Sequence, residues 1–183
     1  MNLPIPESYW VIPGRFLAGE YPVGFDAHAA QERLERFLKA GINSFYDLTR
    51  SNELTPYVSL LNRCTERSNP PIIYRRFPIR DHSIPTRTTM VSILDALDRA
   101  LISDRKIYLH CWGGIGRTGM TVACHLVRRG YTNENALAQV QQWFVTMPKS
   151  SVFQSSPETS EQIRFVLEWR EQPNVGIPTG EDP

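Results

Sequence analysis

The chain has 183 residues and a formal net charge of +1, with 41% hydrophobic and 21% charged residues. This length suits one domain with a real hydrophobic core, and the composition is ordinary for a globular protein. The near-neutral charge argues against a nucleic-acid scaffold or a membrane surface as the partner, and no apolar run is long enough to span a bilayer. All but three of the 20 basic residues are arginines, which suit bidentate phosphate recognition, although a compositional bias explains this equally well.

The N-terminus and the cysteines indicate the compartment. Residues 1–9 have neither a basic start nor an apolar stretch, so we expect no secretory signal. The three cysteines, Cys64, Cys111 and Cys124, are an odd number without a CxxC pair, which argues against a disulfide framework or a zinc site. We therefore expect a cytoplasmic monomer that uses no metal and no cofactor.

Strand-like runs alternate with helical periodicity along the chain, which predicts an α/β fold. The predicted strands are Arg15–Ala18, Ser44–Thr49, Ile72–Phe77 and Lys106–His110. A helix between the first two strands is expected to start at the cap residue Asp26 and to end at Gly41. A second helix follows Pro85, and its apolar stripe consists of Met90, Leu94, Leu97 and Leu101.

Three more helices are predicted after the last strand. The first runs from Gly116 to Arg129, the second starts near Thr132 and Asn133, and the third begins at Pro157. The third helix is expected to bury Ile163, Val166, Leu167 and Trp169. The sequence thus predicts a single domain over residues 1–171 and a flexible C-terminal tail over residues 172–183. In this domain, five or six helices flank a central, mostly parallel sheet of four to five strands.

The segment KIYLHCWGGIGRTG, residues 106–119, carries the chemistry. A Cys followed six positions later by an Arg is frequent by chance, but here a strand precedes the pair, glycines fill it and a helix follows. Glycines let the backbone turn its N–H groups inward, and the helix N-terminus adds its positive dipole end, so the loop is suited to bind phosphate and to stabilise a thiolate. The predicted phosphate-binding residues are Trp112, Gly113, Gly114, Ile115, Gly116 and Arg117.

HCWGGIGRTG resembles the signature loop of the protein tyrosine phosphatase superfamily, and its interior is most similar to small dual-specificity and cyclin-dependent-kinase-associated phosphatases. WVIPGRFLAGEYP, FPIRDHSIP and SPETSEQIRFVLEW resemble the opening segment, the general-acid loop and a late glutamine-bearing helix of that family. The resemblance covers most of the chain from Trp10 to Trp169. It implies a phosphatase fold and a hydrolase that acts on phosphorylated proteins or small phosphomonoesters through a phosphocysteine intermediate.

The resemblance also implies roles for residues of the loop. Cys111 is the expected nucleophile, and Arg117 is expected to clamp the phosphate with two parallel N–H donors. Thr118 matches the hydroxyl that stabilises the sulfur as it leaves in the second step. His110 matches the residue whose imidazole orients the loop.

Two expected residues lie outside the loop. Asp81 lies 30 residues before Cys111 in a loop between two prolines and is the expected general acid, then base. Asp47 and Asp95 are weaker candidates because they fall on a predicted strand and helix. Gln162 matches a glutamine that helps to place the hydrolytic water, although Glu158 stands where the family has another glutamine.

Substrate and alternative functions stay open at this point. The phosphotyrosine-recognition loop of the larger tyrosine phosphatases has no match, so phosphoserine and phosphothreonine join phosphotyrosine as expected substrates. The alternatives are a phosphate-binding module without turnover and a phosphatase for a phosphoinositide, an inositol phosphate or an RNA 5′-phosphate. Arg50 and Glu53 line the cleft or form a surface ion pair, and Cys124 packs in the core or traps an oxidised Cys111.

Overall fold

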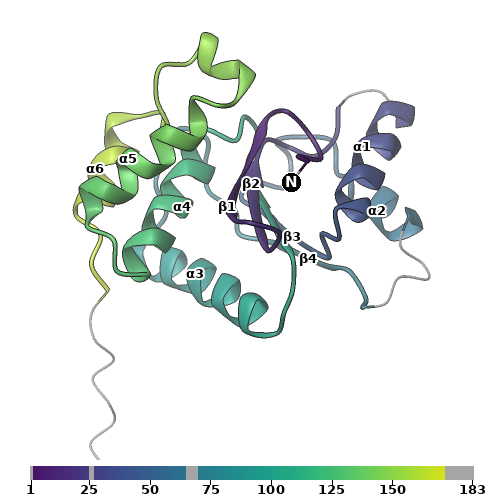
Figure 1. The fold of residues 1–183 in the computed structure, drawn as a ribbon, viewed down its shortest axis with the longest axis horizontal. Helices are drawn as coiled ribbons and strands as arrows, with labels where there is room; N and C mark the ends of the chain where they lie inside the picture. Colours follow the sequence, from purple (N-terminus) through teal and green to yellow (C-terminus); the bar gives the residue numbers. More distant parts are fainter. Residues whose placement is uncertain (1, 25–26, 65–69, 172–183) are drawn as a thin grey trace, which may run out of the picture.

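A five-stranded sheet in the order β1-β2-β5-β3-β4 forms the centre of the computed structural model (Figure 1). The structure describes residues 2–24, 27–64 and 70–171. The strands β2, β5, β3 and β4 run parallel, and β1 pairs antiparallel with β2 at one edge. The strands are β1 (Ser8–Ile12), β2 (Phe16–Gly19), β3 (Ser44–Asp47), β4 (Ile73–Arg76) and β5 (Ile107–His110).

Helices cover both faces of the sheet, with α1 and α2 on one side and α3 to α6 on the other (Figure 1). A hydrophobic core lies on each face, and alternate residues of β5 point to different faces. Tyr108 packs with the α1 and α2 side chains, while Ile107 and Leu109 pack with those of α3 to α6. No described helix combines the length and apolarity needed to cross a membrane. The helices are α1 (Ala27–Lys39), α2 (Val58–Cys64), α3 (Arg87–Ile102), α4 (Gly116–Arg128), α5 (Asn133–Phe144), α6 (Ser160–Leu167) and the 3₁₀-helix η1 (Pro148–Ser151).

This architecture confirms the predicted fold class, with five strands and six α-helices among the described residues. The strand β1 and the short helix α2 were not predicted. The β1–β2 turn is built at Gly14, which has a φ of 72°, so the Pro-Gly pair of the sequence marks a hairpin turn. The expected cap Asp26 and the predicted tail, residues 172–183, lie outside the described residues.

The start of the last helix corrects another prediction. α6 begins at Ser160 and not at Pro157, because the Thr159 hydroxyl accepts a hydrogen bond from the Gln162 N–H while the Gln162 side chain accepts from the Thr159 N–H. This capping box fixes the first turn three residues later than predicted. Val166 and Trp169 are buried as expected, but Leu167 is 42% exposed.

The parallel strands bring three loops together at their carboxyl ends. The loop after β3 is tied to β5 by the Leu48 N–H, which donates to the His110 carbonyl over 2.8 Å. The loop after β4 is tied to the loop after β3 in turn, because the Ile79 N–H donates to the Leu48 carbonyl over 3.0 Å. Open α/β sheets bind ligands at this edge, so residues that follow β3, β4 and β5 share one site.

Candidate active site

The loop between β5 and α4, residues 111–115, packs against β2 at Gly114. Gly114 has a φ of 74°, and a Cβ there would lie 2.4 Å from the carbonyl carbon of Gly19. Only glycine satisfies both the left-handed backbone and this close approach. Cys111 is 2% exposed at the start of the loop, so the thiol lies inside the turn of the backbone.

The N-terminus of α4 is left open for a ligand. The helices α3, α5 and α6 each begin with a threonine cap whose hydroxyl accepts a backbone hydrogen bond, but the cap residue of α4, Ile115, provides none. Within the described part of the chain, no backbone N–H of residues 112–118 donates to a backbone carbonyl. These N–H groups and the positive end of the helix dipole are therefore available to an anion.

Arg117 lies 1% exposed on the first turn of α4, and two carboxylates hold its guanidinium. Nη1 and Nη2 donate to Glu53 over 2.9 and 2.6 Å, and Nη2 also lies 2.7 Å from Asp81 Oδ1. Burial by itself lowers the pKa of Arg117, but the hydrogen bonds to Glu53 and the neighbouring negative groups raise it overall, so the side chain stays charged. Nε is buried without a hydrogen-bond partner among the described residues.

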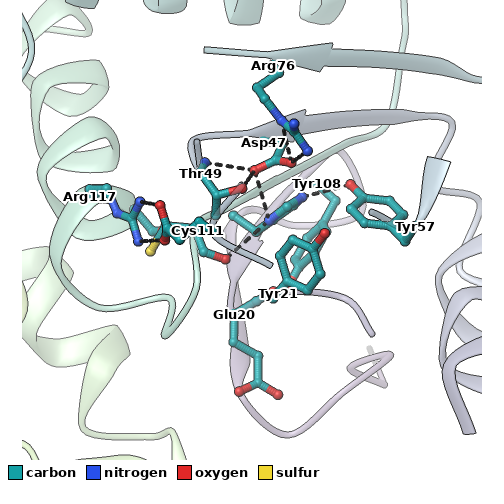
Figure 2. Close-up of polar contacts among 12 residues, drawn as sticks. Glu20, Tyr21, Asp47, Thr49, Tyr57, Arg76, Tyr108, Cys111 and Arg117 are labelled. Carbon is teal, nitrogen blue, oxygen red and sulfur yellow. Dashed lines mark hydrogen bonds and ion pairs between the residues drawn. The ribbon is translucent and has the colours of Figure 1, made fainter. Parts of the chain in front are cut away.

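Figure 2 shows Cys111 and Arg117 on one side and a polar cluster around Asp47 and Tyr57 on the other. His110 is fully buried in this cluster, and burial is the main cause that lowers its pKa, so its imidazole is neutral at pH 7. His110 Nδ1 lies 3.2 Å from the Cys111 carbonyl, and Nε2 lies 2.8 Å from the Tyr57 hydroxyl. Because a carbonyl can only accept, Nδ1 carries the proton and Tyr57 donates to Nε2. The imidazole thus holds the backbone of Cys111 in place.

Asp47 is fully buried behind the loop and does not reach the cleft. Its carboxylate accepts from Thr49, from the Tyr74 hydroxyl over 2.7 Å and from Arg76 over 3.0 and 3.1 Å. Burial by itself raises the pKa of Asp47, but His110 and the hydrogen bonds from Tyr74 and Thr49 lower it overall. The second weak candidate for the acid, Asp95, pairs with Arg128 on α4 over 2.9 Å.

Asp81 lies at the mouth of the loop, where its side chain is 39% exposed. Its Oδ1 pairs with Arg117, and its Oδ2 lies 3.5 Å from Nε2 of His82. His82 has a φ of 56°, and its Nδ1 lies 3.5 Å from Glu158 Oε2. The structure therefore brings the expected general acid beside the expected phosphate clamp.

Thr118 and Gln162 are both fully buried beside the loop. The Thr118 hydroxyl lies 3.4 Å from the Gly19 carbonyl. The Gln162 carboxamide accepts from the Thr159 N–H over 3.3 Å and donates to the Ser83 carbonyl over 3.2 Å. Gln162 thus caps α6 and connects it to the loop that carries Asp81, while its placing of a water stays a prediction.

Two further residues were not predicted from the sequence. Lys149, on η1, donates to the Gly113 carbonyl over 2.9 Å and to Glu20 over 2.8 Å. Glu20 follows β2 and also binds Arg33 over 2.7 Å. No local signal marks these residues, because they lie far from the loop in the sequence.

Cys124 is fully buried on α4, and burial raises its pKa well above that of an ordinary thiol.

Known proteins share parts of this sequence and most of this fold. The chain is 28% identical over 102 residues to human cyclin-dependent kinase inhibitor 3, covering 53% of this chain and 45% of that protein. It is 29% identical over 101 residues to mouse protein tyrosine phosphatase domain-containing protein 1, covering 51% of this chain and 13% of that protein. The chain thus spans less than half the length of these relatives.

Solved phosphatase structures define the class of the fold. The crystal structure of Tk-PTP in the active form matches with a TM-score of 0.69 at 21% identity, covering 89% of this chain and 97% of that one. A structure of kinase associated phosphatase with its catalytic-site cysteine substituted by serine matches with a TM-score of 0.67 at 21% identity, covering 82% and 83%. The fold is therefore that of the tyrosine and dual-specificity phosphatases.

A family model described as "Polymorphic toxin system, DSP-PTPase phosphatase" matches residues 22–131, which is more than half of the chain. The chain belongs to this family. Its membership confirms the family resemblance predicted from the sequence.

Proposed function

We propose that this chain hydrolyses phosphomonoesters through a phosphocysteine intermediate, and that its substrates are phosphotyrosine and phosphoserine or phosphothreonine in proteins. In the first step the Cys111 thiolate attacks phosphorus in line, and an S–P bond forms as the P–O bond to the leaving group breaks. Asp81 gives its proton to the leaving oxygen. Arg117 and the N–H groups of residues 112–117 stabilise the charge on the equatorial oxygens.

In the second step water attacks the phosphocysteine. The Asp81 carboxylate takes a proton from the water as its oxygen bonds to phosphorus, and the S–P bond breaks to release inorganic phosphate and the thiolate. Thr118 stabilises that sulfur, and Gln162 helps to place the water. His110 acts as a positioning residue, because one ring nitrogen holds the Cys111 carbonyl and the other is bonded to the Tyr57 hydroxyl.

The unpartnered Nε of Arg117 carries this proposal. A buried cationic donor without an acceptor costs free energy, of the order of 1–3 kcal/mol, so its position indicates that a ligand supplies the acceptor. That donor lies next to Cys111 and to the uncapped N-terminus of α4. A phosphate oxygen satisfies the guanidinium and the helix N-terminus together.

Phosphate release from para-nitrophenyl phosphate and from phosphopeptides tests the proposal. Cys111→Ser should abolish turnover while phosphate still binds, because the hydroxyl is a far weaker nucleophile than a thiolate. Cys64→Ser is the matched control, since Cys64 lies on α2 and takes no part in the site. Near-normal turnover by Cys111→Ser would refute the mechanism, and phosphate binding by a wild-type protein without turnover would favour a binding module.

A further inference from the structure

Two pockets flank the mouth of the Cys111 loop, and the half-exposed Trp112 and Asp81 line both of them. The first, here called the lysine-side pocket, has a volume of about 350 Å³. The second, here called the arginine-side pocket, has a volume of about 550 Å³. Both pockets offer a wall to the part of a substrate beyond its scissile phosphate.

The lysine-side pocket has no cation to offer. Lys149 is held by Glu20 over 2.8 Å and by the Gly113 carbonyl over 2.9 Å. His82 lies between Asp81 and Glu158, at 3.5 Å from each. Asp81 is paired with Arg117, and the other two carboxylates of this pocket, Glu20 and Glu158, already contact its lysine and its histidine. The lysine-side pocket therefore offers an anionic group no unpaired cation.

The arginine-side pocket has the opposite balance. Arg50 and Arg80 line it and are exposed, and neither guanidinium forms a hydrogen bond or ion pair with any described residue. Its two carboxylates, Glu53 and Asp81, both bind the buried Arg117. Two unpaired guanidinium groups are thus left to face whatever enters the pocket.

Backbone hydrogen bonds fix the loops that carry these two arginines. Arg50 follows β3, and its N–H donates to Glu53 over 3.1 Å, the same carboxylate that binds Arg117. Arg80 follows β4, directly after Ile79, whose carbonyl accepts from Arg117 over 3.0 Å. Glu53 therefore connects Arg50 to Arg117, and Ile79 connects Arg80 to Arg117. The pairing of β3 with β4 places both arginines beside the phosphate clamp.

We propose that Arg50 and Arg80 form a second anion-binding subsite, which selects phosphomonoesters that carry an additional carboxylate or phosphate beside the scissile phosphate. This inference rests on the proposed function, because it assigns the scissile phosphate to Arg117. An exposed arginine pair adds a modest attraction, so we expect a preference of about tenfold in kcat/KM for the doubly anionic substrate. The preference should shrink in 0.5 M salt, because exposed charges are screened there.

The test compares wild type with the Arg50→Gln/Arg80→Gln double variant on two matched substrate pairs. One pair is a phosphotyrosine peptide with flanking Glu or with flanking Gln, and the other is inositol 1,4-bisphosphate or inositol 1-phosphate. The double variant should lose about ten times more kcat/KM on the doubly anionic member of at least one pair. The pair that shows this loss identifies the second group as a carboxylate or a phosphate. Arg75→Gln is the control, because Arg75 is exposed on β4 and lines a different pocket.

Equal losses on both members of both pairs, or no loss on either, would overturn the subsite. Binding of the four ligands to the Cys111→Ser protein, measured by calorimetry, separates this result from a failure of the proposed function. In one outcome, wild type hydrolyses none of the substrates while the two arginine substitutions, made in the Cys111→Ser protein, still lower the affinity for the doubly anionic ligands selectively. That result would support the subsite and refute the proposed hydrolysis. If wild type hydrolyses the substrates but neither turnover nor binding shows a preference for the doubly anionic members, the proposed hydrolysis is supported and the subsite is refuted.

Discussion

Glu53 is predicted to hold the phosphate clamp in its working orientation. Its carboxylate forms two hydrogen bonds with Arg117, at 2.9 and 2.6 Å, and the two side chains are 13% and 1% exposed. Glu53→Gln keeps the size of the side chain, but it replaces one acceptor oxygen by an NH₂ group that faces another donor. Hydrogen bonds to charged groups contribute about 1.5–3 kcal/mol, so we expect the free energy of unfolding to fall by about 2 kcal/mol.

The same change should slow catalysis by a separate route. Without Glu53, Asp81 is the one carboxylate left within 3 Å of the Arg117 guanidinium among the described residues. We therefore expect the guanidinium to turn toward Asp81. A small misplacement of a clamp costs about 10²-fold, and we expect kcat/KM for para-nitrophenyl phosphate to fall by about 10–100-fold. Glu53→Ala leaves a buried charge with less compensation and should destabilise by about 3–5 kcal/mol.

Urea unfolding at pH 7 and phosphate release, measured on the same preparations, test both expectations. Glu161→Gln, an exposed position on α6, is the matched control for removal of one carboxylate. A Glu53→Gln protein with unchanged stability and with turnover within about twofold of wild type would refute the reasoning, because the pair would then be incidental.

Three more predictions concern the acid, the loop and a buried histidine. Asp81→Asn should lower phosphate release by about 10²–10⁴-fold for alkyl phosphates and much less for para-nitrophenyl phosphate, whose leaving group needs no proton. Gly114→Ala should abolish binding of inorganic phosphate, measured by calorimetry, because its Cβ would lie 2.4 Å from the Gly19 carbonyl carbon at a φ of 74°. Burial, with Arg129 adding to it, lowers the pKa of His125 to about 4 from 6.5. The unfolded chain therefore binds a proton first as pH falls from 6.5 to 4, and the free energy of unfolding should drop by up to about 3 kcal/mol across that window.

Each of these has its own control. If Asp81→Asn slows phosphate release equally for both leaving groups, Asp81 is not the general acid. Gly24→Ala, at an open position near the end of the described N-terminal segment, should leave phosphate binding intact, and intact binding by Gly114→Ala would contradict the close approach to Gly19. His125→Gln should flatten the pH dependence of urea unfolding, although His110, whose pKa is also lowered, keeps part of it. An unchanged slope in that variant would show that His125 does not contribute.

Local patterns predicted most elements of the fold. The four parallel strands and α1, α3, α4 and α5 lie within a few residues of their predicted bounds, because amphipathic periodicity and threonine caps are properties of short segments. The start of α6 was wrong because Pro157 suits a first helical position, whereas the reciprocal bonds of Thr159 and Gln162 decide it. The prediction that Leu167 is buried was wrong, because the buried Val166 faces the core and Leu167, the next residue round the helix, faces outward.

The sequence by itself predicted the site at residues 110–118, because the expected nucleophile, the glycine-rich turn and the cation on the next helix are contiguous and need only local folding. The tertiary structure decided what surrounds them. Glu53 and Asp81 follow β3 and β4, and they meet Arg117 because parallel pairing brings the carboxyl ends of those strands to one edge. The same pairing brings Arg50 and Arg80 to one pocket with these two carboxylates. Which cations are paired and which are free depends on distances between these loops, and such distances are set by packing of residues far apart in the chain.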